Sequence, residues 1–205
     1  MFQFFSDGGP IMFLLLACSI AGIYIIINKF LFFKLHFYQY NKSIEDVKSK
    51  LLTYGKNQTL LKLRTNRKIM IKVMSSSITL ASHPRDEIQD GIRESIYQEI
   101  PRIDHLMPFL SSIITVAPIL GLTGTVLGLM DIFNVISGGS IGDTEALSSG
   151  IALALITTVT GLIIALPFIF FYQYFSQKID HFTLELERAS YEIIHFCNHN
   201  DAVGD

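Results

Sequence analysis

The sequence lacks the short motifs that mark nucleotide-driven and hydrolytic enzymes. It contains no GxxxxGK(S/T) phosphate loop, no HExxH or other zinc-ligand spacing, and no GxSxG nucleophile turn. The chain has two cysteines, Cys18 and Cys197, which fall in different regions, so we expect both thiols to be reduced and no disulfide framework to form. We therefore expect no catalytic residue, no metal site and no cofactor, and the chain is not predicted to be an enzyme.

Charge is also missing from two long stretches. Residues 106–130 and 146–177 contain no Asp, Glu, Lys or Arg, and each is longer than the roughly 20 apolar residues that cross a bilayer core. A third apolar run covers residues 11–27; no Lys or Arg precedes it and no small-residue cleavage site follows, which favours a retained span over a signal peptide. Half of the residues are hydrophobic, and such a composition, gathered into uncharged runs, indicates a multi-pass membrane protein in a lipid bilayer.

The basic residues are unevenly distributed and predict the orientation. Twelve Lys and Arg residues lie between 36 and 105, whereas residues 1–10 and 137–145 contain none. By the positive-inside rule, the N-terminus and the 137–145 turn lie outside, and the middle segment and tail lie inside. Acidic residues are interspersed with the basic ones, so we interpret the middle segment as a solvated surface and expect no nucleic-acid partner.

The predicted fold is an all-α membrane protein with three transmembrane helices and long helical cytoplasmic extensions, with its N-terminus outside. In the middle segment, isoleucines recur at helical spacing from Ile88 to Ile100, which predicts packing against other cytoplasmic helices. From Phe175 to Phe196 apolar residues alternate steps of four and three, a seam that predicts packing either on a neighbouring subunit or on the middle segment. The predicted segments are a periplasmic N-terminus (1–9), transmembrane helix 1 (10–34), a cytoplasmic helical segment (35–104), transmembrane helix 2 (105–137), a periplasmic turn (138–144), transmembrane helix 3 (145–176), and a cytoplasmic C-terminal helix and tail (177–205).

Small residues form stripes on the second and third spans. They recur at steps of three and four, which places each set on one helix face, and small residues let helix backbones approach closely in lipid. Pro118 and Pro167 lie inside these spans and can kink the helices. The helix-packing candidates are Ala117, Gly121, Gly124, Gly128, Gly150, Ala154, Gly161 and Ala165.

Two threonines lie at matching depth. Thr125 and Thr158 are each twelve residues from the outer end of their span, about 18 Å below the surface. Their hydroxyls are expected to meet, where they could hold water and relay protons; the alternative is that each bonds its own carbonyl four residues earlier. Thr157 lies on an adjacent face. Asp131, about 9 Å from the outer end, is the carboxylate nearest the membrane interior and completes the proton-path candidates, unless it is an ordinary interfacial residue.

These residues carry a resemblance to a known family. The stretch 117–130, APILGLTGTVLGLM, resembles the second-span signature of the MotA/TolQ/ExbB proton channel family, and 150–162, GIALALITTVTGL, resembles its third-span signature. The match extends over essentially the whole chain and is closer to the ExbB/TolQ branch than to MotA. It differs at Leu153, where many ExbB and TolQ chains have Glu.

The resemblance implies a multi-pass protein of the bacterial inner (cytoplasmic) membrane that forms a homo-oligomer, a pentamer. This would surround single-span ExbD- or TolR-like proteins, whose spans supply a titrating Asp, and a TonB- or TolA-like protein would carry force outward. Thr125 and Thr158 match the family's pore-lining threonines by position. The predicted function is the energising subunit of a proton-driven motor that supports import or envelope functions; the alternative is a non-conducting membrane scaffold that oligomerises and anchors a partner protein.

Overall fold

The computed structural model describes residues 9–37, 40–64, 66, 68–137 and 144–201, and every regular element among them is an α-helix. Three stretches are long and apolar enough to cross a membrane: Pro10–Lys34, Met107–Asn134 and Gly150–His199. The prediction of an all-α membrane protein is therefore confirmed. Most of the predicted outer segments 1–9 and 138–144 and the end of the tail lie outside the described residues, and the predicted orientation stays a prediction.

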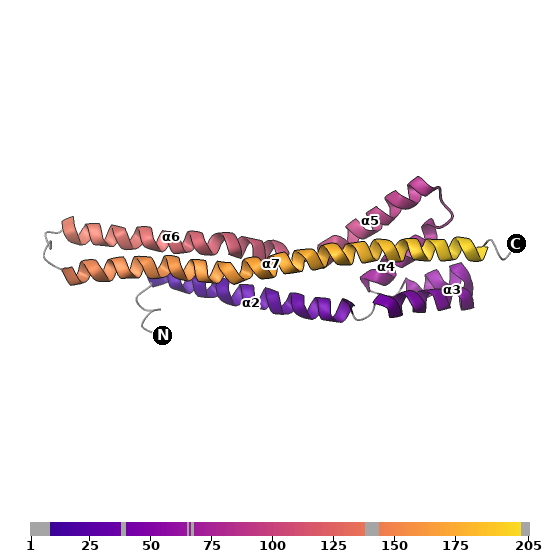
Figure 1. The fold of residues 1–205 in the computed structure, drawn as a ribbon, viewed down its shortest axis with the longest axis horizontal. Helices are drawn as coiled ribbons and strands as arrows, with labels where there is room; N and C mark the ends of the chain where they lie inside the picture. The colour runs from indigo at the N-terminus through magenta and orange to yellow at the C-terminus, as the bar shows by residue number, and fades with distance from the viewer. Residues whose placement is uncertain (1–8, 38–39, 65, 67, 138–143, 202–205) are drawn as a thin grey trace. The chain divides into compact units, whose positions relative to one another are not determined.

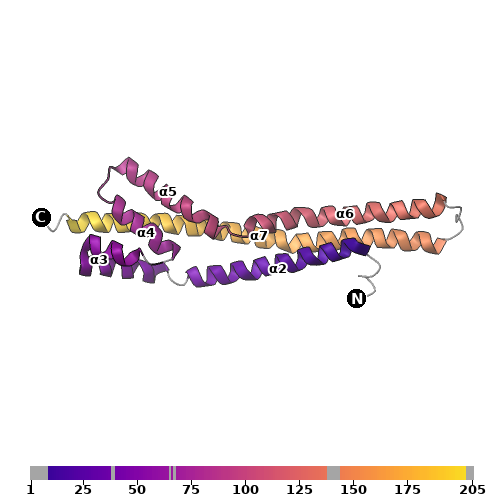
Figure 2. The same cartoon turned by 180° about the vertical axis from the view of Figure 1, so that it is seen from behind.

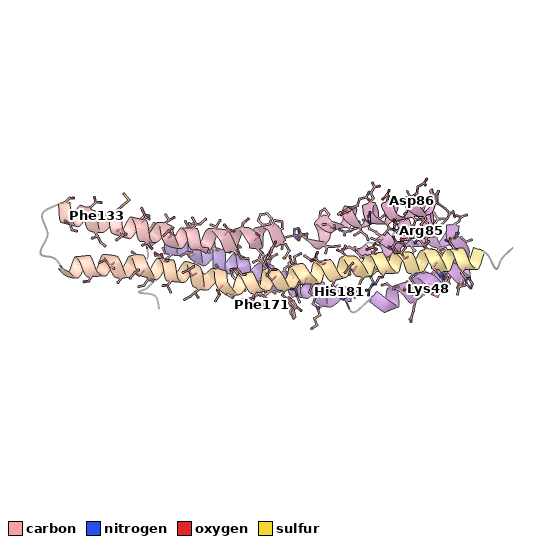
Figure 3. The ribbon with its side chains drawn as sticks, turned by 45° about the horizontal axis from the view of Figure 1, so that its top comes forward. Lys48, Arg85, Asp86, Phe133, Phe171 and His181 are labelled. Atoms are coloured by element: carbon pink, nitrogen blue, oxygen red, sulfur yellow. The ribbon has the colours of Figure 1, made fainter. Side chains whose placement is uncertain are left out.

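The chain divides into two compact units, and the first consists of Met1–Lys29 and Leu106–Phe175. It contains most of α2 (Gly9–Phe37), all of α6 (Met107–Ser137) and the first half of α7 (Thr144–Asp201). In Figures 1 and 2, α6 and α7 run side by side. Leu15 of α2 and Ala117 of α6 belong to one buried apolar cluster, and Ile25 of α2 and Phe168 of α7 belong to another. Phe133 and Phe171 point outward (Figure 3), as expected for a surface in contact with lipid or another subunit.

The second unit consists of Phe30–His105 and Ser176–Asp205. It contains α3 (Tyr40–Leu63), α4 (Ile69–Leu80), α5 (Arg85–Ile103) and the second half of α7. The α4 helix packs against both α3 and α5, and lies between them in Figures 1 and 2. Ile88, Ile92 and Ile96 of the α5 stripe are buried in the core of this unit, as predicted, whereas Ile100 is half-buried. The apolar seam of α7 from Ile179 to Phe196 packs into the same core, so its partner is the middle segment of the same chain.

Two residues with positive φ mark breaks in the helical backbone. Gly55, with φ 71° and ψ 174°, interrupts α3, in a region that residues with a Cβ avoid. Leu106, with φ 73°, separates α5 from α6. Pro101 lies inside α5, which continues to Ile103. The break before the second membrane helix therefore comes at Leu106, and this helix begins at Met107 rather than at residue 105.

A buried carboxylate joins α4 to α5. Glu99 is only 7% exposed, and its two oxygens accept hydrogen bonds from Lys72 Nζ at 2.8 Å and from Arg102 at 2.9 Å. Burial raises the pKa of the Glu99 carboxyl, but the hydrogen bonds and charges of Lys72 and Arg102 outweigh burial and lower this pKa below its usual value. Glu99 is therefore ionised at neutral pH and links the two helices.

Candidate functional site: a hydroxyl cluster between α6 and α7

The backbones of α6 and α7 approach closely at glycines. A Cβ atom added to Gly161 would lie 2.5 Å from the carbonyl oxygen of Ala117, and one added to Gly121 would lie 2.8 Å from the carbonyl oxygen of Thr157. Real Cβ atoms essentially never come within 3.0 Å of another heavy atom. The two helices can therefore adopt this spacing because these positions carry no side chain.

The residues predicted to pack helices lie on the sides of α6 and α7 that face into the unit. Gly150 is half-buried and contacts Ile132, while the other seven are buried. This close approach brings side-chain hydroxyls of one helix within reach of backbone carbonyls of the other. The eight residues are Ala117, Gly121, Gly124 and Gly128 on α6, and Gly150, Ala154, Gly161 and Ala165 on α7.

Two threonine hydroxyls bridge the helices in a reciprocal arrangement. The Thr158 hydroxyl donates to the carbonyl oxygen of Gly121 at 3.1 Å, and the Thr125 hydroxyl donates to that of Ala154 at 3.0 Å. Gly121 lies four residues before Thr125, and Ala154 lies four residues before Thr158. Each hydroxyl thus reaches the carbonyl that the other could have used within its own helix. The two hydroxyls also lie within hydrogen-bond distance of each other, and either can be the donor. Because each hydroxyl has a single proton, the one that donates to the other hydroxyl does not donate to its carbonyl at the same time.

Thr157 joins the same contact. Its side chain is 2% exposed, and its hydroxyl lies 2.8 Å from the Ala154 carbonyl oxygen and 3.3 Å from the Gly121 carbonyl oxygen. A Cβ atom on Gly124 would collide with the Thr157 side chain. We name the hydroxyls of Thr125, Thr157 and Thr158, with the carbonyls of Gly121 and Ala154, the hydroxyl cluster.

Other threonines in these spans bond within their own helix. The Thr123 hydroxyl donates to the Ile119 carbonyl at 2.8 Å, and the Thr160 hydroxyl donates to the Ile156 carbonyl at 2.8 Å. By contrast, Thr125 Oγ1 is 3.5 Å from its own Gly121 carbonyl, farther than from Ala154 on the other helix. Local back-bonding therefore describes Thr123 and Thr160, whereas Thr125 and Thr158 connect two helices.

The structure does not bring Asp131 into the hydroxyl cluster. Its side chain is exposed, whereas the adjacent Ile132 is the residue that faces α7. Pro118 and Pro167 lie within uninterrupted helices, and the predicted kinks stay predictions. The side chain of Leu153 lies outside the described part of the chain.

The cluster determines what this site can do chemically. Hydroxyls and carbonyls can order water and pass hydrogen bonds along, but none of these groups ionises near neutral pH. In the part of the chain that the structure describes, no three His, Cys, Asp or Glu residues converge to hold a metal ion.

The two carbonyl acceptors were not predicted from the sequence. The signal that could have identified them is the repeated spacing of a small residue four positions before a threonine, Gly121 with Thr125 and Ala154 with Thr158. A small side chain leaves the carbonyl next to it accessible to a neighbouring helix. Sequence spacing also placed Thr157 on an adjacent face, although the structure includes it in the contact.

Comparison with known proteins adds independent information. A model of the MotA/TolQ/ExbB proton channel family matches residues 62–188, which include α4 to α6 and most of α7. A biopolymer transport protein ExbB homologue of Methanothermobacter thermautotrophicus is 29% identical over 187 residues, covering 87% of this chain and 63% of the relative. The ExbB-like 3 protein of Synechocystis is 29% identical over 167 residues, covering 80% and 79%. The Tol-Pal system protein TolQ of Haemophilus influenzae is 34% identical over 105 residues, covering 46% of each chain.

Proposed function

Because the chain belongs to the MotA/TolQ/ExbB proton channel family, we propose that it is the energising subunit of a proton-driven motor in the inner membrane. The matched relatives are named for biopolymer transport and for the Tol-Pal system, which supports a role in import or envelope maintenance. The match spans less than two thirds of the length of two of these relatives. The observation that carries the proposal is the reciprocal hydrogen bonding of Thr125 and Thr158.

This arrangement is suited to a proton relay. In one order, Thr158 donates to Thr125, which donates to the Ala154 carbonyl; in the other, Thr125 donates to Thr158, which donates to the Gly121 carbonyl. When one hydroxyl accepts a proton and the other releases one, the first hydrogen-bond arrangement changes into the second. Rotation of the two hydroxyls then restores the first arrangement. Each proton that crosses 100 mV releases about 2.3 kcal/mol, so several protons could drive a mechanical step.

The absence of an ionisable group in the cluster supports a second chain as the proton carrier. We propose a homo-oligomer, a pentamer, around single-span ExbD- or TolR-like proteins whose intramembrane Asp passes the hydroxyl clusters in turn. A TonB- or TolA-like protein would transmit the motion, and the N-terminus would lie outside. Native mass spectrometry of the chain co-expressed with such a partner tests this composition. A homo-oligomer that never takes up the partner would contradict it.

Proton flux into liposomes that contain this assembly tests the relay. Thr125→Val and Thr158→Val remove a hydroxyl with little change of shape, and each should reduce the flux several-fold because the relay needs both groups. The double variant should lose little more proton flux than either single variant, because the two hydroxyls act together. Thr123→Val is the matched control, because its hydroxyl bonds within its own helix. Unchanged flux in the double variant would refute the relay.

The second candidate is a non-conducting membrane scaffold. The lack of a carboxylate in the hydroxyl cluster favours it, since all three hydroxyls have carbonyl acceptors and could serve packing alone. Interhelical hydrogen bonds of this kind contribute about 0.6 kcal/mol each in membranes. A scaffold would keep its partner and its biological activity in the Thr125→Val, Thr158→Val double variant, whereas a conducting subunit would keep the partner and lose activity.

A further inference from the structure

The second unit has opposite charge on two of its sides. Residues 40–80, which comprise α3, α4 and the connection between them, contain nine Lys or Arg and two Asp or Glu. Three of the basic residues, Lys48, Lys50 and Lys72, form ion pairs within the chain. The α5 helix, 85–103, contains five acidic and three basic residues. Because α4 packs against both α3 and α5, the outer face of α3 and that of α5 lie on different sides of this unit (Figures 1 and 2).

The exposed face of α5 is an acidic ridge with one aromatic residue. Figure 3 shows Asp86 at the solvent-exposed start of the helix. Asp90, Glu94 and Tyr97 follow at steps of four and three, on the face opposite the buried isoleucines. None of Asp86, Asp90 and Glu94 forms an ion pair with another described residue. Tyr97 is 67% exposed, so its ring is available for a contact with another molecule.

A groove of about 510 Å³ opens between α3 and α4. Its lining combines apolar, cationic and hydroxyl groups: Leu60, Leu61 and Arg64 from the α3 side, and Ser75, Ser76 and Thr79 from α4. Leu61 is 68% exposed. Arg64 forms no ion pair with the described residues. A phenol ring suits such a lining, because the ring packs on leucine and a guanidinium while its hydroxyl meets other hydroxyls.

We propose that the acidic ridge of α5 in one copy of this chain docks on the α3–α4 groove of the next copy. Tyr97 enters the groove, and Asp90 and Glu94 face Arg64 and the neighbouring basic side chains of α3. Both surfaces belong to the same chain and carry complementary charge, which favours a second copy over an unrelated protein. The proposal rests on the homo-oligomer of the proposed function, and it specifies which faces meet.

The geometry determines the type of assembly. A contact between two different faces of the same chain is heterologous, so each copy uses its α5 ridge on one neighbour and its groove on the other. Repetition of such a contact closes into a ring when the rotation allows. The contact is expected to centre on Tyr97, since buried aromatic residues surrounded by polar groups contribute most to protein interfaces.

Disulfide cross-linking of the full-length protein in membranes tests the pairing directly. The cysteine on α5 replaces Arg93, an exposed residue four positions before Tyr97 on the same face, so that Tyr97 and the acidic residues stay in place. In a chain that carries both Ser76→Cys and Arg93→Cys, oxidation should give a ladder of covalent multimers, because every copy carries one thiol on each face. Either single variant, which keeps Cys18 and Cys197, should give no ladder. The matched control combines Arg93→Cys with Leu52→Cys, an exposed α3 position that does not line the groove; it should also give no ladder.

Charge exchange provides a second, independent readout by native mass spectrometry. Arg64→Glu and Glu94→Arg should each reduce the oligomer several-fold, and the double variant should restore it, because the charges again complement each other. If the oligomer forms, but the cysteines do not cross-link and the charge reversals leave its amount unchanged, this pairing would be overturned while the proposed function would remain intact. A chain that stays monomeric under all conditions would overturn both. Cross-linking of the two cysteines to a co-purified chain of different mass would show that the ridge or groove binds another partner and would also overturn the pairing.

Discussion

Alanine at Gly161 is expected to disturb the contact between α6 and α7 more than alanine at Gly121 or Gly128. The added Cβ would lie 2.5 Å from the Ala117 carbonyl oxygen at Gly161 and 2.8 Å from the Thr157 carbonyl oxygen at Gly121. At Gly128 the nearest atom, at 3.0 Å, is the Cβ of Ala154. All three obstacles are fixed by the backbone, since the Cβ of Ala154 cannot rotate away either, so the expected order follows the size of the overlap.

The magnitude follows from the displacement that each overlap requires. Ordinary van der Waals contact begins at 3.4 Å, so Gly161→Ala has to move the helices apart by about 1 Å. Overpacking of this kind costs about 1–3 kcal/mol. The same displacement would lengthen the bond from Thr158 Oγ1 to the Gly121 carbonyl, now 3.1 Å, beyond the range of a good hydrogen bond.

Thermal unfolding of the purified protein in detergent, followed by circular dichroism, measures the effect. For a chain of this length, each kcal/mol lowers Tm by about 2–4 °C. The expected order of destabilisation is Gly161→Ala, then Gly121→Ala, then Gly128→Ala, with proton flux decreasing in the same order. If Gly128→Ala proved as damaging as Gly161→Ala, the close backbone contact at Gly161 would be refuted.

Two further predictions concern the second unit. Glu99→Gln should destabilise it by about 1–2 kcal/mol at neutral pH, because both ion pairs are lost and their partners are half-exposed. The pKa of the Glu99 carboxyl is lowered in the folded state. Its contribution to the free energy of unfolding is therefore present above the unfolded value of about 4.5 and is lost as the pH falls through the lower folded value. Urea unfolding across this range should show a pH dependence that the variant lacks, and an equal change of unfolding free energy with pH in both proteins would contradict the ion-pair geometry. Gly55→Ala should lower the free energy of unfolding by about 1–3 kcal/mol. Backbone strain alone should cause this loss, because no atom lies within 4 Å of the added Cβ. Gly55→Asn should do no better, since ψ 174° lies outside the left-handed helical region that Asn tolerates; an unchanged unfolding midpoint in both variants would contradict the strained conformation.

Membrane-spanning character could be predicted from the sequence because it depends on local composition. A run without charge crosses the bilayer wherever it lies in the fold, so residues 106–130 and 146–177 identify two spans by themselves. The matching depth of Thr125 and Thr158 could also be predicted from the sequence, since helical rise converts residue number into distance. The isoleucine stripe of α5 predicted burial for the same reason of fixed periodicity.

Contacts between helices required the tertiary structure, because they depend on rotation and approach as well as on depth. Spacing could not distinguish a subunit interface from an internal core for the α7 seam, and the fold assigns it to the middle segment. Thr157 belongs to the hydroxyl cluster because glycine at 124 leaves room for its side chain. The acceptors of the bridging hydroxyls are backbone carbonyls, which every residue has, so sequence alone could not select those of Gly121 and Ala154. The sequence thus determined which residues enter the membrane and how deep they lie, and the packing of small residues decided which hydroxyls meet.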